Sequence, residues 1–387
     1  MSLKKDEKFS WLPDASQTLA LQAALGNRET ACAAWQKIKD NVSLEKFETT
    51  SRRLFPLIYD NLQKHNLQDD ATLPLKIVHR ETFRDNRLLF QKAEQILQDF
   101  HRAGISTLLL KGAALSMLYY RSSALRPMAD IDVLIKREDF QKAVRVLKKN
   151  KWQPAAANLL LYIEIYPSCQ FTDADGGELD LHWQIMRESW NADNTDSLWN
   201  DAVETKIGNT PVKVLSPAHQ LFHICWHGVQ YSPTPPIRWI ADAVMILRKS
   251  KDEINWEKLV EIACLHRVNL MIFTALDYLN KNFAASIPLK VLSGLKTAPL
   301  TRMQKAASIL QMSENPAPWT RRKYLRYYTI KYLSLRSSTK LKPQSLVFVK
   351  FLQYHLEIDS YWQVPFSTLS KAFQHFILRR ASQYNKD

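Results

Sequence analysis

Glycine is scarce in this chain, and its scarcity limits which folds and active sites the chain can form. The sequence has 8 glycines in 387 residues, at positions 26, 104, 112, 176, 177, 208, 228 and 294. Phosphate-binding loops and nucleophile elbows need glycines at fixed spacings, where the backbone turns sharply or approaches a ligand. No G-x-G-x-x-G, G-x-x-x-x-G-K-[ST] or G-x-S-x-G motif can be formed from these positions. The chain therefore lacks the usual motifs of Rossmann dehydrogenases, P-loop NTPases and α/β-hydrolases.

Composition and cysteine spacing indicate a folded protein of a reducing compartment. The residues are 46% hydrophobic and 24% charged, as in folded soluble proteins. The four cysteines form no C-x-x-C pair, which indicates neither a disulfide framework nor a zinc ribbon. No apolar stretch typical of a signal peptide or a membrane span is present. We therefore expect a cytoplasmic protein without a transmembrane segment.

The net charge of +15 is concentrated near the C-terminus. Residues 301–387 contain 15 Lys/Arg and 4 Asp/Glu, and cations alternate with aromatic residues in 320–333 and 340–354. This pattern favours an anionic partner such as a nucleic acid, an anionic lipid surface or a polyphosphorylated ligand. A solvated basic helix face with tyrosines packed inward is the alternative.

The hydrophobic pattern predicts an α+β protein, predominantly helical, with a small mixed sheet between two helical regions. Helical spacing extends from residue 14 to about 103, short strand-like runs alternate with helices from 105 to 183, and helices resume at Ser216-Pro217. The glycine-containing segment 173–177 predicts a hairpin turn rather than a calcium loop. We divide the chain into a helical N-terminal region (1–103), an α/β core (104–214) and a helical C-terminal region with the basic tail (215–387).

Three aspartates form the main candidate catalytic site. Asp130 and Asp132 are two residues apart on an expected strand, so their side chains project from the same face. Asp180 lies in a second apolar-Asp-apolar strand, and pairing of the two strands would bring it to the same place. Carboxylate oxygens are the ligands that Mg²⁺ or Mn²⁺ prefers. The sequence therefore predicts that Asp130, Asp132 and Asp180 bind metal.

A phosphate site is predicted next to these aspartates. Gly112 lies where a strand leads into a helix, and the free N–H groups and dipole of a helix N-terminus favour an anion there. Lys111 and Arg126 would add positive charge for a nucleoside triphosphate. Pairing of Arg126 with one of the aspartates is the alternative.

Histidines provide candidate residues around the metal site. His182 shares a strand face with Asp180 and would orient a metal-bound water or the acceptor, although a hydrogen-bonded packing role explains it equally well. His219, His223 and His227 recur every four residues on one expected helix. Zinc ligands sometimes have that spacing, but the glutamate of a zincin is absent, so we favour buried or site-facing hydrogen bonding for His223 and His227.

Trp239 and Asp242 lie on an expected helix after the proline break at 233–236. This helix is a candidate for closing over the nucleotide or acceptor. Alternatively, Arg238 and Asp242 form an i, i+4 pair that only braces the helix.

The sequence resembles a known family. Lys-Gly at 111–112, Arg-Pro-Met-Ala-Asp-Ile-Asp at 126–132 and Leu-Asp-Leu at 179–181 are similar to the motifs of the uncharacterised nucleotidyltransferase family of bacteria, within the DNA polymerase β-like superfamily. The similarity extends over roughly residues 15 to 300. The resemblance implies that the three aspartates hold two divalent ions and that a nucleoside monophosphate is transferred from an NTP, such as ATP, to an acceptor. Lys111 stands where the superfamily has a small polar residue, and Gly112 precedes Asp130 by an unusually long 18 residues.

Two other functions remain open from the sequence. Asp130-Ile-Asp132 is also the D-x-D pattern of metal-dependent glycosyltransferases that use a nucleotide sugar, but that hypothesis leaves Lys111, Gly112 and Asp180 unexplained. A catalytically degenerate nucleotidyltransferase fold that binds nucleic acid or another anion through its basic tail is the third possibility. The acceptor is equally open and includes a small molecule, a glycan precursor, a peptide, a protein or RNA.

Overall fold

The computed structural model describes residues 9–313, except for 42–43, 45–46, 157–158, 160–161, 164–165, 187–195 and 231–236, and it also describes residue 363. The basic segments 320–333 and 340–354, on which the predicted anion-binding tail rests, lie outside the described residues. The proline break at 233–236 also lies outside them.

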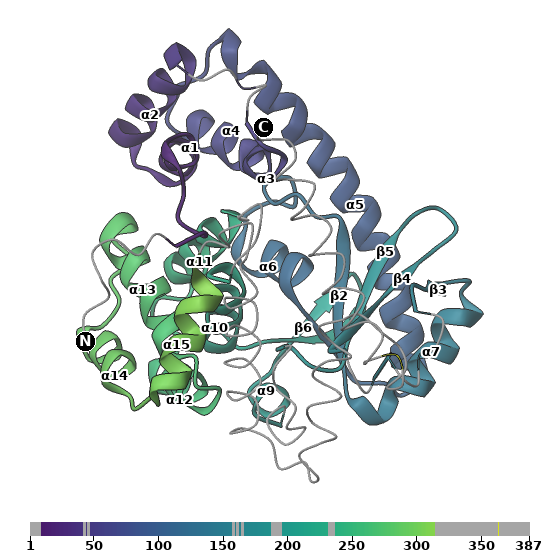
Figure 1. Cartoon of the computed structure of the whole chain (residues 1–387). Helices are drawn as coiled ribbons and strands as arrows, with labels where there is room; N and C mark the ends of the chain where they lie inside the picture. The colour runs from purple at the N-terminus through teal and green to yellow at the C-terminus, as the bar shows by residue number, and fades with distance from the viewer. Residues whose placement is uncertain are drawn as a thin grey trace, which may run out of the picture.

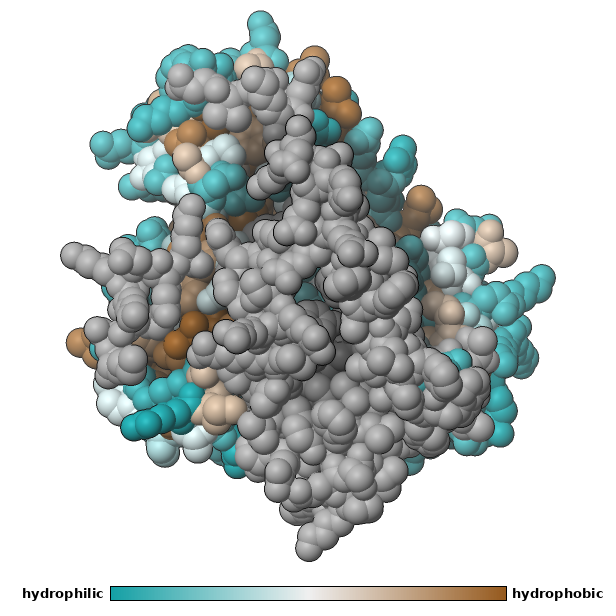
Figure 2. Space-filling view, in the orientation of Figure 1, coloured by the Kyte–Doolittle hydropathy of each residue, from teal (hydrophilic) through white to brown (hydrophobic). Residues whose placement is uncertain are grey.

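Helices precede the sheet, as the hydrophobic spacing predicted. They are α1 (Ala15–Leu25), α2 (Arg28–Asn41), α3 (Thr49–Arg52), α4 (Phe55–Lys64), the short η2 (Asp70–Thr72) and the long α5 (Leu73–Arg102). A capping box starts α1: the Asp14 carboxylate accepts the N–H of Gln17 at 2.8 Å, and the Gln17 side chain accepts the N–H of Asp14 at 3.0 Å. Helix α5 runs from these helices along the sheet (Figure 1). The surface of this part is mainly hydrophilic with scattered apolar patches (Figure 2).

The central region forms a seven-stranded mixed sheet in the order β3-β4-β5-β2-β1-β7-β6. Its strands are β1 (Thr107–Leu109), β2 (Asp130–Ile135), β3 (Gln153–Pro154), β4 (Ser168–Thr172), β5 (Glu178–His182), β6 (Val203–Ile207) and β7 (Thr210–Val214). The pairs β2–β5 and β1–β7 are parallel, and the others are antiparallel. Helices α6 (Lys111–Tyr119), α7 (Phe140–Lys149, preceded by η3, Arg137–Asp139) and α9 (Asp196–Asn200) interrupt the strands. The predicted turn at 173–177 joins β4 to β5, where the Asp173 N–H donates to Gly177 O at 3.0 Å.

Alternation along β2 and β5 separates apolar from acidic side chains. The core beneath α5 and α7 contains Ile131, Val133 and Ile135 of β2 and Leu179 and Leu181 of β5. Because neighbouring side chains of a strand point to opposite faces, the intervening residues face away from α5. The two strands thereby present their aspartates together on the opposite face of the sheet.

The C-terminal helices pack against the N-terminal ones. They are α10 (Pro217–Gly228), α11 (Arg238–Lys249), α12 (Trp256–Leu265), α13 (Asn269–Phe283), α14 (Leu289–Thr297) and α15 (Arg302–Met312). Trp11 contacts Trp239 and Tyr278 edge-on, with ring centroids 5.6 and 5.3 Å apart. Residues of both regions belong to one apolar core, whereas the sheet has a core of its own beneath α5. The fold is the predicted α+β arrangement, in which helical regions precede and follow the mixed sheet along the chain. Among the described residues, no helix has the length and apolar character needed to cross a membrane.

Close packing of α10 on α11 gives a testable expectation for Gly228. A Cβ added to Gly228 would overlap the Trp239 ring, which is itself buried. We expect Gly228→Ala to lower the free energy of unfolding by about 1–3 kcal/mol, measured by urea denaturation, because overpacking forces side chains off their rotamers. The control is Gly294→Ala within α14, where the added Cβ meets only Val260 at 3.9 Å, and a neutral or slightly stabilising effect is expected. Equal stability of the two variants would contradict this packing.

Candidate active site

The site begins at the junction of β1 and α6. Leu110 ends the strand segment and donates its backbone N–H to Asp132 O at 2.9 Å, which ties this junction to β2. Lys111, the first residue of α6, has a φ of +39°, in the left-handed region that non-glycine residues rarely adopt. Strain of this kind costs about 1–3 kcal/mol and collects at functional sites. The site therefore contains a lysine whose backbone conformation is strained.

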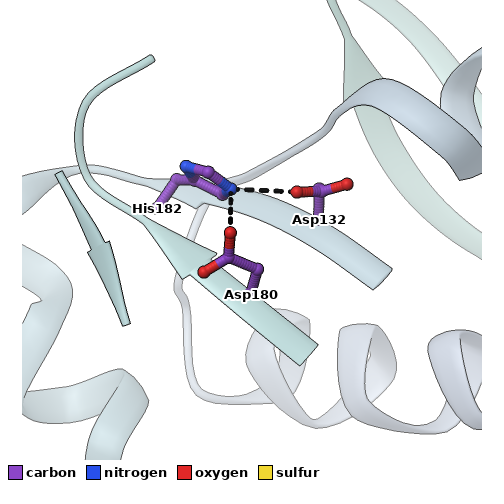
Figure 3. Close-up of side chains that lie close together, drawn as sticks. All are labelled: Asp132, Asp180 and His182. Atoms are coloured by element: carbon purple, nitrogen blue, oxygen red, sulfur yellow. Dashed lines mark hydrogen bonds and ion pairs between the residues drawn. The ribbon is translucent and has the colours of Figure 1, made fainter. Parts of the chain in front are cut away.

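The strand register brings the aspartates together as predicted. In the parallel pair β2–β5, Asp132 lies opposite Asp180, and His182 lies two residues further along β5. His182 Nε2 is 3.0 Å from Asp132 Oδ1 and 2.9 Å from Asp180 Oδ2, so the imidazole edge points between the two carboxylates (Figure 3). Lys111 Nζ is 2.6 Å from the same Oδ1 of Asp132 and 4.0 Å from Asp180 Oδ2. Two strands and one helix start thus meet at one cluster of charges.

Burial and charge act in opposite directions on these groups. Burial acts to raise the pKa of Asp132, but Lys111 and His182 outweigh it and hold that pKa well below its usual range. Burial likewise acts to raise the pKa of Asp180, and the hydrogen bond and charge of His182 overcome it, so the pKa is lowered. Asp130 differs, because burial and repulsion from Asp132 raise its pKa. Burial acts to lower the pKa of Lys111, but attraction to Asp132 prevails and raises it.

The donor set fits a divalent cation. Oxygen atoms of Asp132 and Asp180 and a ring nitrogen of His182 lie within 4.8 Å of one another. Two carboxylates with one imidazole suit Mn²⁺ and allow Mg²⁺. Asp130, the predicted third metal ligand, faces the same side of the sheet but is outside this group, and His182 stands in its place. Because Lys111 Nζ and His182 Nε2 now contact the carboxylate oxygens, a cation would have to compete with both.

The geometry can now be compared with known proteins. A sequence profile of the uncharacterised nucleotidyltransferase family matches residues 49–284, more than half of the chain. The chain belongs to this family. A solved structure, that of an antigenic nucleotidyltransferase-like protein from Paracoccidioides brasiliensis, is similar over 55% of this chain and 93% of that chain, with 18% identity and a TM-score of 0.36. No curated protein matches the chain.

Family membership supports a transferase with a nucleotide substrate and agrees with the resemblance noted in the sequence. The matched segment contains the whole sheet and the helices α10 and α11. The family itself is uncharacterised, so the acceptor and the number of metal ions have to be argued from this chain.

Gly112 and Arg126 lie together at the start of α6, but Arg126 is engaged elsewhere. A Cβ on Gly112 would lie 2.9 Å from Arg126 Nη1 and 3.2 Å from Met128, so this glycine makes room for the segment that leads into β2. Arg126 Nε and Nη2 donate to the two carboxylate oxygens of Asp242 at 2.8 and 2.9 Å. Only 3% of Arg126 is exposed. The structure therefore places the predicted phosphate-binding arginine in a buried pair with an aspartate other than those of the predicted metal site.

Asn86 is a structural residue of the site that the sequence analysis missed. It lies on α5, is buried, and donates from Nδ2 to Ser123 O at 2.5 Å and to Arg126 O at 2.8 Å. Its Oδ1 accepts the N–H of Met128 at 3.2 Å. Asn86 thereby fixes the segment that precedes Asp130. A polar residue within a long amphipathic helix carries no sequence pattern that would reveal this role.

The histidines of α10 do not form a metal site with one another in the described part of the chain. His219 Nδ1 is 2.8 Å from Ser216 Oγ, and burial lowers the pKa of His219 to about 4. His223 is buried, and burial, followed by the charge of Lys111, lowers its pKa well below the usual value. His223 therefore lies within electrostatic range of the carboxylate cluster, whereas His227 is more exposed and its ring centre is 6.4 Å from that of His223.

Trp239 and Asp242 are both buried on α11 but have different surroundings. Trp239 packs between α10 and the N-terminal segment. Asp242 accepts hydrogen bonds from Arg126 and from the Tyr120 hydroxyl, the latter at 2.7 Å. The i, i+4 ion pair of Arg238 with Asp242, the alternative left open from the sequence, is not seen among the described residues, where Arg238 donates to Pro127 O at 2.6 Å. Helix α11 is thus fastened to the segment before β2, next to the site.

Proposed function

We propose that the protein is a nucleotidyltransferase that depends on a divalent metal and moves a nucleoside monophosphate from an NTP to a hydroxyl group of an acceptor. The observation that carries the proposal is the register of Asp132 with Asp180, with Lys111 of the α6 N-terminus between them. Family membership supports the nucleotide as substrate. We keep Asp130, Asp132 and Asp180 as the proposed catalytic carboxylates.

In the proposed reaction the acceptor oxygen bonds to the α-phosphorus, the bond from that phosphorus to the bridging oxygen breaks, and pyrophosphate leaves as the hydroxyl proton is released. Bound divalent metal would supply charge stabilisation for the attacking and leaving oxygens. Asp132 and Asp180, with Asp130 beside them, would hold it, and His182 would either join them or orient them. Lys111 and the N–H groups at the start of α6 would bind phosphate oxygens. Asp180 and Lys111 beside Asp132 favour this proposal over the glycosyltransferase, which does not explain them.

The test is metal-dependent nucleotide binding. We expect one of ATP, GTP, CTP or UTP to raise the thermal stability of the wild type only with Mg²⁺ or Mn²⁺, since a ligand at 100 times its Kd adds about 2.7 kcal/mol. Asp132→Asn should lose this stabilisation. The matched control is Asp277→Asn, which removes a carboxylate from the surface pair with Lys281 and should keep the response.

Two results would contradict the proposal. Stabilisation by UDP-sugars but by no free triphosphate would favour a glycosyltransferase. An equal, metal-independent response of the wild type and Asp132→Asn would show that the carboxylates do not take part, as in a degenerate binding module.

A further inference from the structure

Arg238 is a cation beside the active site, and no described carboxylate forms an ion pair with it. It is the first residue of α11 and is partly exposed. Its Nη1 donates to Pro127 O at 2.6 Å, three residues before Asp130. Asp242, one helical turn further along α11, is the acid that would be expected to pair with it, but Arg126 takes both carboxylate oxygens. Within the described residues, the fork of Arg238 therefore retains donors that no carboxylate uses.

Positive charge is in excess at this position. Burial, with the charges of Arg126 and Arg53, lowers the pKa of Arg238 to about 9, although Asp242 acts in the opposite direction. Arg238 therefore remains charged at neutral pH. The other arginines repel it, and of the two acids within electrostatic range, Asp242 is already paired with Arg126 and Asp130 belongs to the carboxylate cluster. An anion would relieve the repulsion between these guanidinium groups.

The start of α11 also favours an anion. The first turn of the helix contains no acidic residue, and Ile237 provides no side-chain cap. A cation at a helix N-terminus is disfavoured by the helix dipole, whereas an anion there is stabilised by it. The start of α11 therefore leaves room for a further negatively charged group beside Arg238.

Arg238 lies within electrostatic range of the proposed catalytic carboxylates. Burial and Asp132 raise the pKa of Asp130, and the charge of Arg238 is among those that act to lower it, so the two groups interact across the site. Arg126, in contrast, is buried and holds α11 to the segment before β2 through Asp242. Arg126 therefore positions α11, whereas Arg238 is partly exposed.

We propose that Arg238 binds the phosphate chain of the nucleotide. The inference rests on the proposed function and adds a binding residue from the C-terminal helices, in place of Arg126. A guanidinium fork matches two phosphate oxygens, which a single ammonium group cannot do.

The test uses Mg²⁺-tripolyphosphate as the probe, in calorimetric titrations of the full chain. We expect Arg238→Met to bind the probe about tenfold or more weakly than the wild type, and Arg238→Lys to recover part of the loss. Thermal stability without ligand should fall only modestly, through loss of the hydrogen bond to Pro127 O. Arg121→Met is the matched control, because it removes an exposed guanidinium that is paired with Asp60.

The outcomes separate this inference from the proposed function. If the wild type binds neither tripolyphosphate nor any NTP with metal, the proposed function fails. If the wild type binds the probe and Arg238→Met binds it within about twofold of the wild type, only the inference about Arg238 is overturned. The inference is also overturned if Arg238→Met no longer binds inorganic phosphate but still binds tripolyphosphate and NTP as the wild type does. Arg238 would then bind a phosphate of the acceptor. Should Arg238→Met fail to fold, the comparison of Arg238→Lys with the wild type decides, since the charge is kept and only the fork is lost.

Discussion

Arg126→Ala is expected to lower the free energy of unfolding by about 3–5 kcal/mol, because it leaves a buried carboxylate without its cation. The side chains of Arg126 and Asp242 are 4% and 3% exposed, and two charge-assisted hydrogen bonds of 2.8 and 2.9 Å join them. In the variant Asp242 would retain the hydroxyl of Tyr120 as its hydrogen-bond donor. The Tyr120 hydroxyl does not neutralise charge, so most of the desolvation cost of Asp242 would remain.

Urea denaturation at pH 7 measures this effect. Arg121→Ala, which removes an exposed guanidinium from its pair with Asp60, should cost less, about 1 kcal/mol. The double variant Arg126→Met/Asp242→Leu should regain much of the loss, because it removes both buried charges and not just one. A loss below about 1 kcal/mol in Arg126→Ala would contradict the assigned role of the pair.

Acid should reduce the difference between Arg126→Ala and the wild type. Burial acts to raise the pKa of Asp242, but Arg126 outweighs it, so the pKa is lower in the folded protein than in the unfolded chain. A group of this kind contributes stability above its unfolded pKa and loses that contribution as the pH falls through its folded pKa. The variant lacks the contribution from the start, so its deficit should shrink in the acidic range. A deficit that grows as the pH falls would show that another interaction is responsible.

Lys111→Met is expected to raise the affinity for Mn²⁺ in the absence of nucleotide by roughly 10–100-fold. Lys111 Nζ is 2.6 Å from Asp132 Oδ1 and 4.0 Å from Asp180 Oδ2. The ammonium group therefore takes the place of a metal ion and neutralises the carboxylate charge that would attract one. Two unit charges 4 Å apart interact by about 4 kcal/mol at an effective dielectric constant of 20, which is enough to support a change of this size. The same variant should bind NTP with metal more weakly, because the ammonium group would no longer reach the phosphates.

Calorimetric titration with Mn²⁺ alone tests the first part. Lys92→Met is the control, because Lys92 pairs with Asp173 at the β4–β5 turn and its loss should leave Mn²⁺ binding unchanged. If Lys111→Met binds Mn²⁺ less tightly than the wild type, the lysine supports the metal site and does not compete with the ion.

The alternation of apolar and acidic residues was sufficient to predict the centre of the site. It placed Asp130 and Asp132 on one strand face, and it identified the strand of Asp180, which the β2–β5 register then aligned with Asp132. His182 followed from the same two-residue spacing. Lys111 was identified by its place at the strand-to-helix junction, but its left-handed backbone and its contact with Asp132 depend on tertiary structure.

The surrounding contacts were beyond the reach of local patterns. Helical spacing suggested that Asp242 pairs with Arg238, whereas the fold brings Arg126 from 116 residues away and gives Asp242 two charge-assisted hydrogen bonds. A buried pair with two hydrogen bonds is stronger than an exposed i, i+4 pair, because burial strengthens the attraction between the charges. Asn86 depended in the same way on where α5 passes the segment before β2.

The shared core of the N- and C-terminal helices has a consequence for synthesis of the chain on the ribosome. Ser10 donates its backbone N–H to Met312 O at 3.1 Å, and Trp11 contacts Trp239 and Tyr278. The first helices therefore emerge long before the helices that cover them, while the intervening sheet has a separate apolar core and has all its strands by Val214. During translation, the apolar faces of the early helices stay exposed until the C-terminal helices have been synthesised. In this period the nascent chain can aggregate or bind chaperones.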